Sequence, residues 1–153
     1  MKNWIRSAVT GMMFERPAQK LTIGQLGARL AQSGSDLMDQ FAAAPETDAN
    51  RSQLCHIIGI ERWGQSRLQV ALGDPLRDDE YDDYRPADDL DWDALQEMFR
   101  TTRADTLALA HRLDQAGLDT TVTVPHNQYG KLTVYAWLRY LDVHSKLEGQ
   151  RIK

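Results

Sequence analysis

Apolar residues recur at helical spacing along most of this 153-residue chain, and this period restricts its fold more than any other feature. In the segment 21–44, successive apolar side chains are three, four, seven and four positions apart. This spacing places them on one face of an amphipathic helix, which Pro45 ends. The face consists of Ile23, Leu26, Leu30, Leu37 and Phe41.

A second helix is predicted between the turn "PETDAN" and a stop at Gly73 and Pro75. Thr47, Asp48 and Asn50 are its candidate N-caps, and it runs to about residue 72. Its inward residues are Leu54, Ile57, Ile58, Leu68 and Leu72, beside a neighbouring stripe of His56, Ile60, Trp63 and Val70.

A third helix is predicted to begin after Asp89 or Asp91 and to end at Gly117. The short β-branched run "TTVTVPH" follows it, and we expect an extended connector here because no partner strand is evident. A fourth helix is predicted from about Lys131. The inward residues of the third helix are Leu95, Phe99, Thr102, Leu109 and Leu113.

Four long amphipathic helices without an internal repeat predict an all-α fold, a four-helix bundle in a single domain over residues 1–153. A short N-terminal helical segment precedes the bundle, and a long acidic loop separates its second and third helices. The lengths of the connections are compatible with an up-down-down-up order of the helices and with a simple up-and-down order. The sequence leaves both orders open.

Charge and cysteine content exclude several classes of protein. Residues 74–93 hold ten acidic residues and two arginines, a local balance of −8 in a chain of net charge −4. Such a run is typical of a solvated loop, and overall acidity without a Lys/Arg cluster argues against nucleic acid as a partner. No apolar run approaches the ~20 residues of a membrane span, so no membrane partner is expected. The single cysteine, Cys55, excludes an internal disulfide and favours a reducing, cytoplasmic setting.

One stripe of the fourth predicted helix combines core residues with residues that can bind a metal. Trp137, Leu141, His144 and Glu148 follow one another at spacings of four, three and four residues. His144 and Glu148 can therefore reach one ion, and His56 is the candidate third ligand because it lies beside the core stripe of the second helix. Two nitrogens and one carboxylate would leave open positions, as in catalytic divalent sites.

A structural role for the same residues is the alternative. A histidine on an apolar face is commonly a hydrogen-bonded core or boundary residue, and His144 with Glu148 is also a common surface pair. Glu148 could equally form a buried ionic contact with His144 or with Arg67. His111 and His126 are weaker ligand candidates, although the connector that carries His126 passes over one end of the bundle.

Other chemistry is sparse in this sequence. Cys55 is expected to act as a small buried hydrophobic residue. The sequence contains no GxSxG, no phosphate-binding glycine loop and no CxxC. Trp4, Trp63, Trp92 and Trp137 are expected to be core or boundary aromatic residues.

Several segments in this order are similar to the DinB/YfiT-like family of four-helix bundles, named from DNA-damage-inducible members. They are "LCHIIGIERWGQSRLQVALGDP", the Asp-rich loop with "YRP", "LDWDALQEMFRTTRADTLAL" and "YGKLTVYAWLRYLDVHSKLEGQRI". The resemblance covers roughly residues 20–152. It implies a metal site in which His56 and His144 match two of the family's three histidine ligands. Glu148 stands at the position of the third.

The resemblance also implies a function. Characterised relatives include thiol-dependent transferases and isomerases that use bacillithiol, mycothiol or glutathione. The leading hypothesis is therefore a cytoplasmic, metal-dependent, thiol-transferase-like enzyme of stress response or detoxification. The expected metal is zinc or nickel, and the expected substrate is a small molecule. By analogy with the family, we expect a homodimer. A non-catalytic bundle that has lost its metal, serving in small-molecule binding or interaction, is the alternative. A metallohydrolase is a third possibility, because an open divalent site also activates water.

Overall fold

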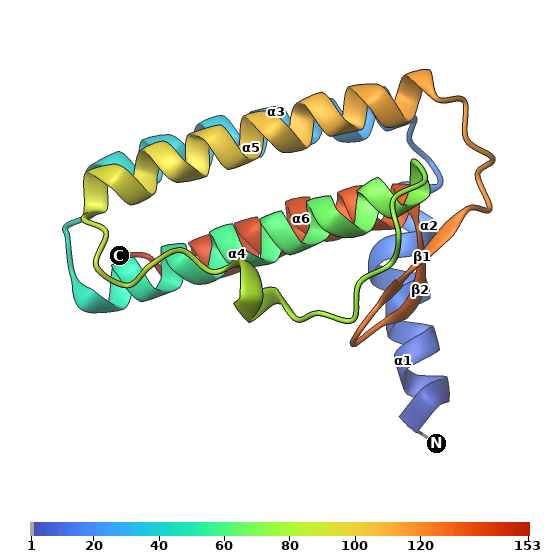
Figure 1. Cartoon of the computed structure of the whole chain (residues 1–153), viewed down its shortest axis with the longest axis horizontal. Coiled ribbons are helices and arrows are strands. Elements are labelled where there is room, and N and C mark those ends of the chain that lie inside the picture. Colours follow the sequence, from blue (N-terminus) through green and yellow to red (C-terminus); the bar gives the residue numbers. More distant parts are fainter. Residues whose placement is uncertain (1) are drawn as a thin grey trace.

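The computed structural model describes residues 2–153, and four long helices build most of it. They are α3 (Ile23–Ala43), α4 (Asp48–Ala71), α5 (Trp92–Gln115) and α6 (Val134–Gly149). Helices α3 and α5 form one layer and α4 and α6 the other, and across the layers α5 packs on α4 and α3 packs on α6 (Figure 1). The predicted all-α four-helix bundle is confirmed.

The direction of the helices settles the order that the sequence left open. Helices α3 and α6 run one way along the bundle, and α4 and α5 run the other way (Figure 1). The order is therefore up-down-down-up. It requires a long return connection from the end of α4 to the start of α5, and the acidic segment provides this connection, with the short 3-10 helix η2 (Tyr81–Tyr84) in its middle.

Side-chain caps fix the first turns of all four bundle helices. Thr22 and Gln25 form a reciprocal capping box at α3. The Thr47 hydroxyl accepts from the Asn50 amide at 3.0 Å, and the Asp91 carboxylate accepts from the amide of the third residue after it at 2.8 Å. Thr133 caps α6 in the same way. Thr47 and Asp91 were among the predicted caps, and both are confirmed.

A two-stranded hairpin replaces the isolated connector that the sequence predicted. Strand β1 (Thr123–His126) pairs antiparallel with β2 (Gly130–Thr133), with Thr123 opposite Thr133 and His126 opposite Gly130. The predicted helix start near Lys131 was wrong, because residues 130–133 form the partner strand. This strand is only four residues long and directly continuous with α6, so no turn signal separates the two in the sequence.

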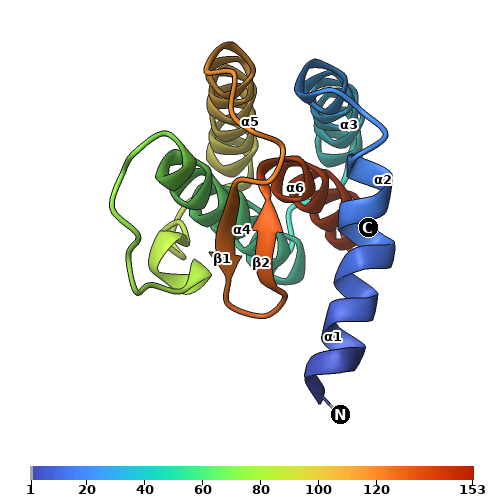
Figure 2. The same cartoon turned by 90° about the vertical axis from the view of Figure 1, so that its right-hand side faces the viewer.

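The N-terminal segment is helical, as predicted, and projects from one end of the bundle (Figure 2). It comprises α1 (Lys2–Thr10), the π-helical segment η1 (Gly11–Glu15) and α2 (Arg16–Ala18). Phe14 and Ala18 are buried and anchor its second half in the core. Trp4, by contrast, is 75% exposed, so its prediction as a core or boundary residue was wrong.

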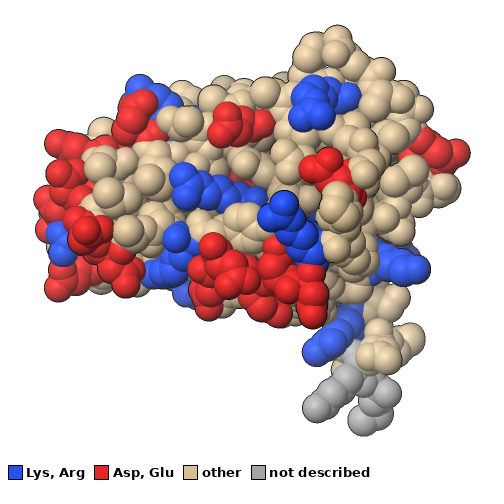
Figure 3. Space-filling view, viewed as in Figure 1, with Lys and Arg blue, Asp and Glu red and all other residues tan. Residues whose placement is uncertain are grey.

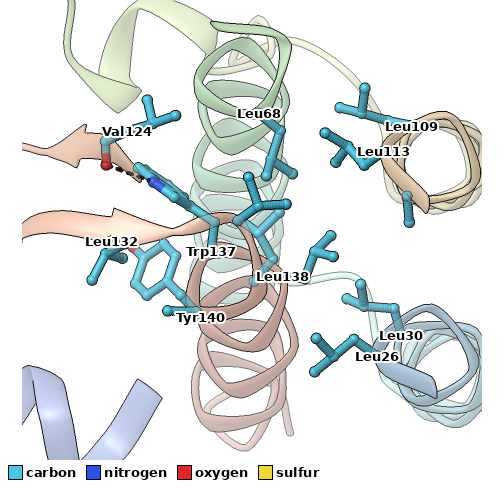
Figure 4. Packing of buried hydrophobic residues seen from close by; sticks show 14 of the residues in the cluster. Leu26, Leu30, Leu68, Leu109, Leu113, Val124, Leu132, Trp137, Leu138 and Tyr140 are labelled. Carbon is cyan, nitrogen blue, oxygen red and sulfur yellow. Dashed lines mark hydrogen bonds between the residues drawn. The ribbon is translucent and has the colours of Figure 1, made fainter. Parts of the chain in front are cut away.

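The other three tryptophans are buried, and Trp137 joins the hairpin to the bundle. Its indole Nε1 donates to the carbonyl oxygen of Val124 in β1 at 3.0 Å. Trp137 and Tyr140 of α6 both extend toward the hairpin, while leucines of α3 and α5 fill the opposite side of the core (Figure 4). The hairpin is therefore fixed over the side of the bundle formed by α4 and α6.

A charged pair crosses the bundle interior. Arg103 of α5 donates from Nε and Nη2 to the two carboxylate oxygens of Glu61 in α4, at 2.7 and 2.9 Å. The guanidinium also donates to the hydroxyls of Ser33 in α3 and Ser145 in α6, so all four helices contribute to this network. Gly34 leaves the necessary space, since a Cβ there would lie 2.8 Å from Cγ of Arg103.

Loss of the Arg103 charge should destabilise the protein strongly. We expect Arg103→Met to lower the free energy of unfolding by about 3–5 kcal/mol, because it leaves the buried Glu61 carboxylate unpaired. The double variant with Glu61→Leu should recover part of this loss. The control is Arg100→Met on the same helix, whose exposed ion pair with Glu97 should contribute less than about 1 kcal/mol. Urea-induced unfolding gives the free energy of unfolding of all three variants. Equal losses of stability for Arg100→Met and Arg103→Met would show that the buried pair with Glu61 is not important for stability.

Candidate metal centre

His56 of α4 and His144 of α6 face each other where these antiparallel helices pack side by side. Their ring centroids are 5.2 Å apart. Glu148 lies one turn beyond His144 on α6, and one ligand atom from each of the three residues lies within 4.8 Å of the other two. All three are partly buried. The structure thus brings together the three residues selected from the sequence, which we call the His–His–Glu cluster.

The spacing of the cluster suits a single divalent cation. Two ligand atoms that each lie about 2.0–2.2 Å from a zinc ion are at most about 4.4 Å apart. The three ligand atoms lie within 4.8 Å of one another, so small rotations of the side chains would bring them to this spacing. All three side chains remain partly exposed, so the cluster is not sealed from solvent.

Electrostatics keep both imidazoles in the form that binds metals. Burial, reinforced by the neighbouring His56, lowers the pKa of His144 to about 4, against the opposing effect of Glu148. Burial also lowers the pKa of His56. Both rings are therefore neutral at pH 7, each with a nitrogen lone pair available, and no proton has to be displaced when a cation binds.

Glu148 is held in place by a glutamine that the sequence analysis did not select. Nε2 of Gln53 in α4 donates to Glu148 Oε2 at 2.6 Å and to the main-chain oxygen of Glu148 at 3.2 Å. Arg151 approaches the same carboxylate oxygen at 3.3 Å. Both contacts use Oε2, which leaves Oε1 for a ligand bond.

Arg67, one of the two alternative ionic partners considered for Glu148, has a different role. Arg67 donates to the carbonyl oxygens of Arg77 and Asp79 in the acidic segment, at 2.9 and 3.2 Å, and to Oδ1 of Asn127 in the hairpin turn at 3.1 Å. Its guanidinium also lies 5.2 Å from the ring centre of Trp63. This buried cation therefore fastens the acidic segment and the hairpin to α4.

Tyrosines border the cluster on two sides. The edge of the Tyr81 ring in η2 meets the His56 ring at a centroid distance of 5.4 Å, and the Tyr140 ring lies 5.7 Å from that of His144. Gly59 allows η2 to approach, because a Cβ there would lie 3.3 Å from the carbonyl oxygen of Tyr81. Tyr140 precedes His144 by one helical turn, a spacing that could have revealed it in the sequence. Tyr81 had no such signal, because it lies in the acidic loop.

The two weaker histidine candidates do not join the cluster. His111 is exposed on α5. His126 is buried among aromatic rings, and its Nδ1 accepts from the amides of Gln128 and Tyr129 at 3.0 and 3.3 Å. Burial lowers the pKa of His126 to about 3, so this residue is a neutral structural element of the hairpin. Cys55 is buried as expected, and burial raises the pKa of its thiol.

The fold and the cluster define a class of protein: an up-down-down-up four-helix bundle with histidines from two antiparallel helices meeting beside a carboxylate. A family model described as the DinB superfamily matches residues 40–147. The chain therefore belongs to the DinB superfamily. The matched region includes His56 and His144 and ends one residue before Glu148.

No curated protein and no solved structure was similar enough to match the chain. Within residues 2–153, every helix is too short or too polar to cross a membrane.

Removal of Gln53 should weaken metal binding without removing a ligand. We expect Gln53→Ala to reduce zinc affinity by about 10- to 100-fold, because residues that orient a ligand typically have effects of this size. Competition with a chromophoric chelator measures the affinity. Gln69→Ala, on the same helix but away from the cluster, is the matched control. Equal zinc affinities of the Gln53 variant and the wild type would show that Gln53 does not position Glu148.

Proposed function

We propose that this protein is a divalent-metal-dependent enzyme resembling thiol-dependent S-transferases, with zinc or nickel held by His56, His144 and Glu148. The single observation that carries the proposal is the meeting of two neutral imidazoles and a carboxylate on one accessible side of the bundle. This donor set, with positions left open, is typical of catalytic rather than structural sites. Membership of the DinB superfamily supports the thiol-dependent chemistry.

The chain's own residues would bind and orient the reactants. A divalent cation held here would lower the pKa of a small-molecule thiol and increase the fraction of thiolate that can attack an electrophile. Gln53 and Arg151 keep the Glu148 carboxylate oriented. Tyr81 and Tyr140 shield the imidazoles from water on two sides. Burial raises the pKa of the Tyr140 phenol, so this group stays protonated.

A non-catalytic bundle is the second candidate, and one observation favours it. The Glu148 carboxylate already has a hydrogen-bond donor in Gln53 and an ionic partner in Arg151, so it does not require a cation as its partner. In that case the cluster would be structural, and the protein would serve in small-molecule binding or interaction.

Metal content separates the two candidates. We expect protein purified without a histidine tag to contain about one zinc or nickel ion per chain by elemental analysis, and His144→Ala to contain none. Glu148→His should raise zinc or nickel affinity, because imidazole is the better ligand for these borderline ions. Background metal in the wild type and in Glu148→His, even after incubation with zinc, would contradict the metal-dependent function.

We also propose that the protein is a homodimer, as the family resemblance implies. The exposed apolar side chains of the N-terminal segment provide an apolar surface for contact between the two subunits, since Trp4 and Met12 are 75% and 68% exposed. Elsewhere in residues 2–153, the exposed large apolar side chains are Leu76 and Leu147, so the bundle itself offers no comparable surface.

Sedimentation equilibrium tests the dimer. We expect the wild type to be dimeric at micromolar concentrations and the double variant Trp4→Glu, Met12→Glu to be monomeric, because it places charges on the apolar face. Leu76→Glu, which changes an isolated exposed leucine in the acidic segment, should remain dimeric. A monomeric wild type would remove the proposal.

A further inference from the structure

Two arginines flank the His–His–Glu cluster. Arg151 follows α6, and its Nη1 lies 3.3 Å from Glu148 Oε2. Its side chain is 71% exposed, so this contact leaves most of the guanidinium accessible to a ligand. One cationic group therefore stands at the α6 border of the cluster.

The second arginine, Arg85, borders the cluster from the α4 side. It follows η2 directly, and a Cβ on Gly59 would lie 3.3 Å from its Cα, so its backbone lies against α4. Its Nη2 donates to the carbonyl and hydroxyl oxygens of Ser52, both at 3.1 Å. Ser52 precedes His56 by one helical turn, and both bonds to it use the same guanidinium nitrogen.

The charges of both arginines reach the cluster. The Arg151 guanidinium contacts the Glu148 carboxylate at 3.3 Å, and the Arg85 guanidinium is bonded to Ser52, one helical turn before His56. Two guanidinium groups beside a bound divalent cation would place positive charge on both sides of the cluster. Positive charge arranged in this way attracts anionic ligands.

We infer that the thiol used by this protein carries carboxylates, and that Arg85 and Arg151 bind them on either side of the His–His–Glu cluster. Arginine is suited to this role, because its planar guanidinium can form two parallel hydrogen bonds with one carboxylate. Glutathione and bacillithiol carry carboxylates and would meet this requirement, whereas mycothiol carries none. This inference rests on the proposed thiol-dependent function.

Binding of a charged and an uncharged form of one thiol tests the inference without measuring activity. The probes are glutathione and glutathione diethyl ester, which differ only in their two carboxylates, and calorimetric titration into zinc-loaded protein gives both dissociation constants. We expect the acid to bind about 10- to 100-fold more tightly than the ester, because charge-assisted hydrogen bonds contribute about 1.5–3 kcal/mol. The double variant Arg85→Gln, Arg151→Gln should bind the two probes about equally.

Matched controls isolate the role of these two arginines. Arg100→Gln, Arg112→Gln removes the same charge from exposed positions on α5 and should keep the preference for the acid. The single variant Arg151→Gln, at an exposed position, should lose part of the preference without affecting folding. Comparing the acid-to-ester ratio between variants also cancels any difference in thiol acidity between the probes.

The outcomes distinguish this inference from the function on which it rests. Equal binding of acid and ester by the wild type, or an unchanged preference in the double variant, would overturn the inference and leave the thiol-dependent function standing. Zinc-loaded wild type that binds neither probe would contradict the thiol-dependent function itself, and the inference with it.

Discussion

The close packing of α4 against α6 is the constraint on which the cluster depends. Gly64 of α4 lies directly against Leu141 of α6, where a Cβ would come within 2.5 Å of Leu141 Cδ2. One side of this contact buries Trp63 and Trp137 together, with ring centroids 5.4 Å apart. Two turns further along, the same antiparallel alignment places His56 opposite His144. The distance between the ligands is therefore set by the packing of two helices and not by flexible loops.

Polar interactions organise the rest of the molecule around this pair of helices. The Arg103–Glu61 pair fixes α5 against α4, and its hydrogen bonds to serines of α3 and α6 fix the other two helices. Arg67 fastens the acidic segment and the hairpin over the outer side of α4. Figure 3 shows acidic side chains gathered along the lower edge of the molecule, where the acidic segment runs in the view of Figure 1. The segment is thus solvated on its outside and held to α4 by the buried Arg67 and by the bonds of Arg85 to Ser52.

Much of this architecture could be predicted from the sequence, because the local spacing of apolar residues indicates where helices form. The inward residues Leu95, Phe99 and Leu109 and the caps Thr47 and Asp91 follow from spacing and residue type, and His144 with Glu148 follows from the four-residue repeat. Pairings between distant segments left no such signal. The β2 strand was read as the start of α6, since a four-residue strand has too few positions to show alternation.

The residues that surround the His–His–Glu cluster could not be predicted from the sequence for the same reason. Gln53 contacts Glu148 only after α4 and α6 have packed, and Tyr81 reaches His56 only because Gly59 lets η2 approach α4. Trp4 was predicted to be a core or boundary residue from its residue type, but it lies on α1, which projects from the bundle, and is therefore exposed. Residue type and period predict which face of a helix is apolar, but not whether another segment covers it.

The central claim is that His56, His144 and Glu148 bind one divalent cation, and the local environment of a bound zinc ion tests it most directly. X-ray absorption fine structure of the zinc-loaded protein should show two imidazole nitrogens at about 2.0–2.1 Å, oxygen ligands at about 2.0–2.2 Å, and no sulfur. His144→Ala should lose one imidazole from the first coordination shell or lose the zinc altogether. A zinc environment without imidazole, or one unchanged in the His144 variant, would contradict the account.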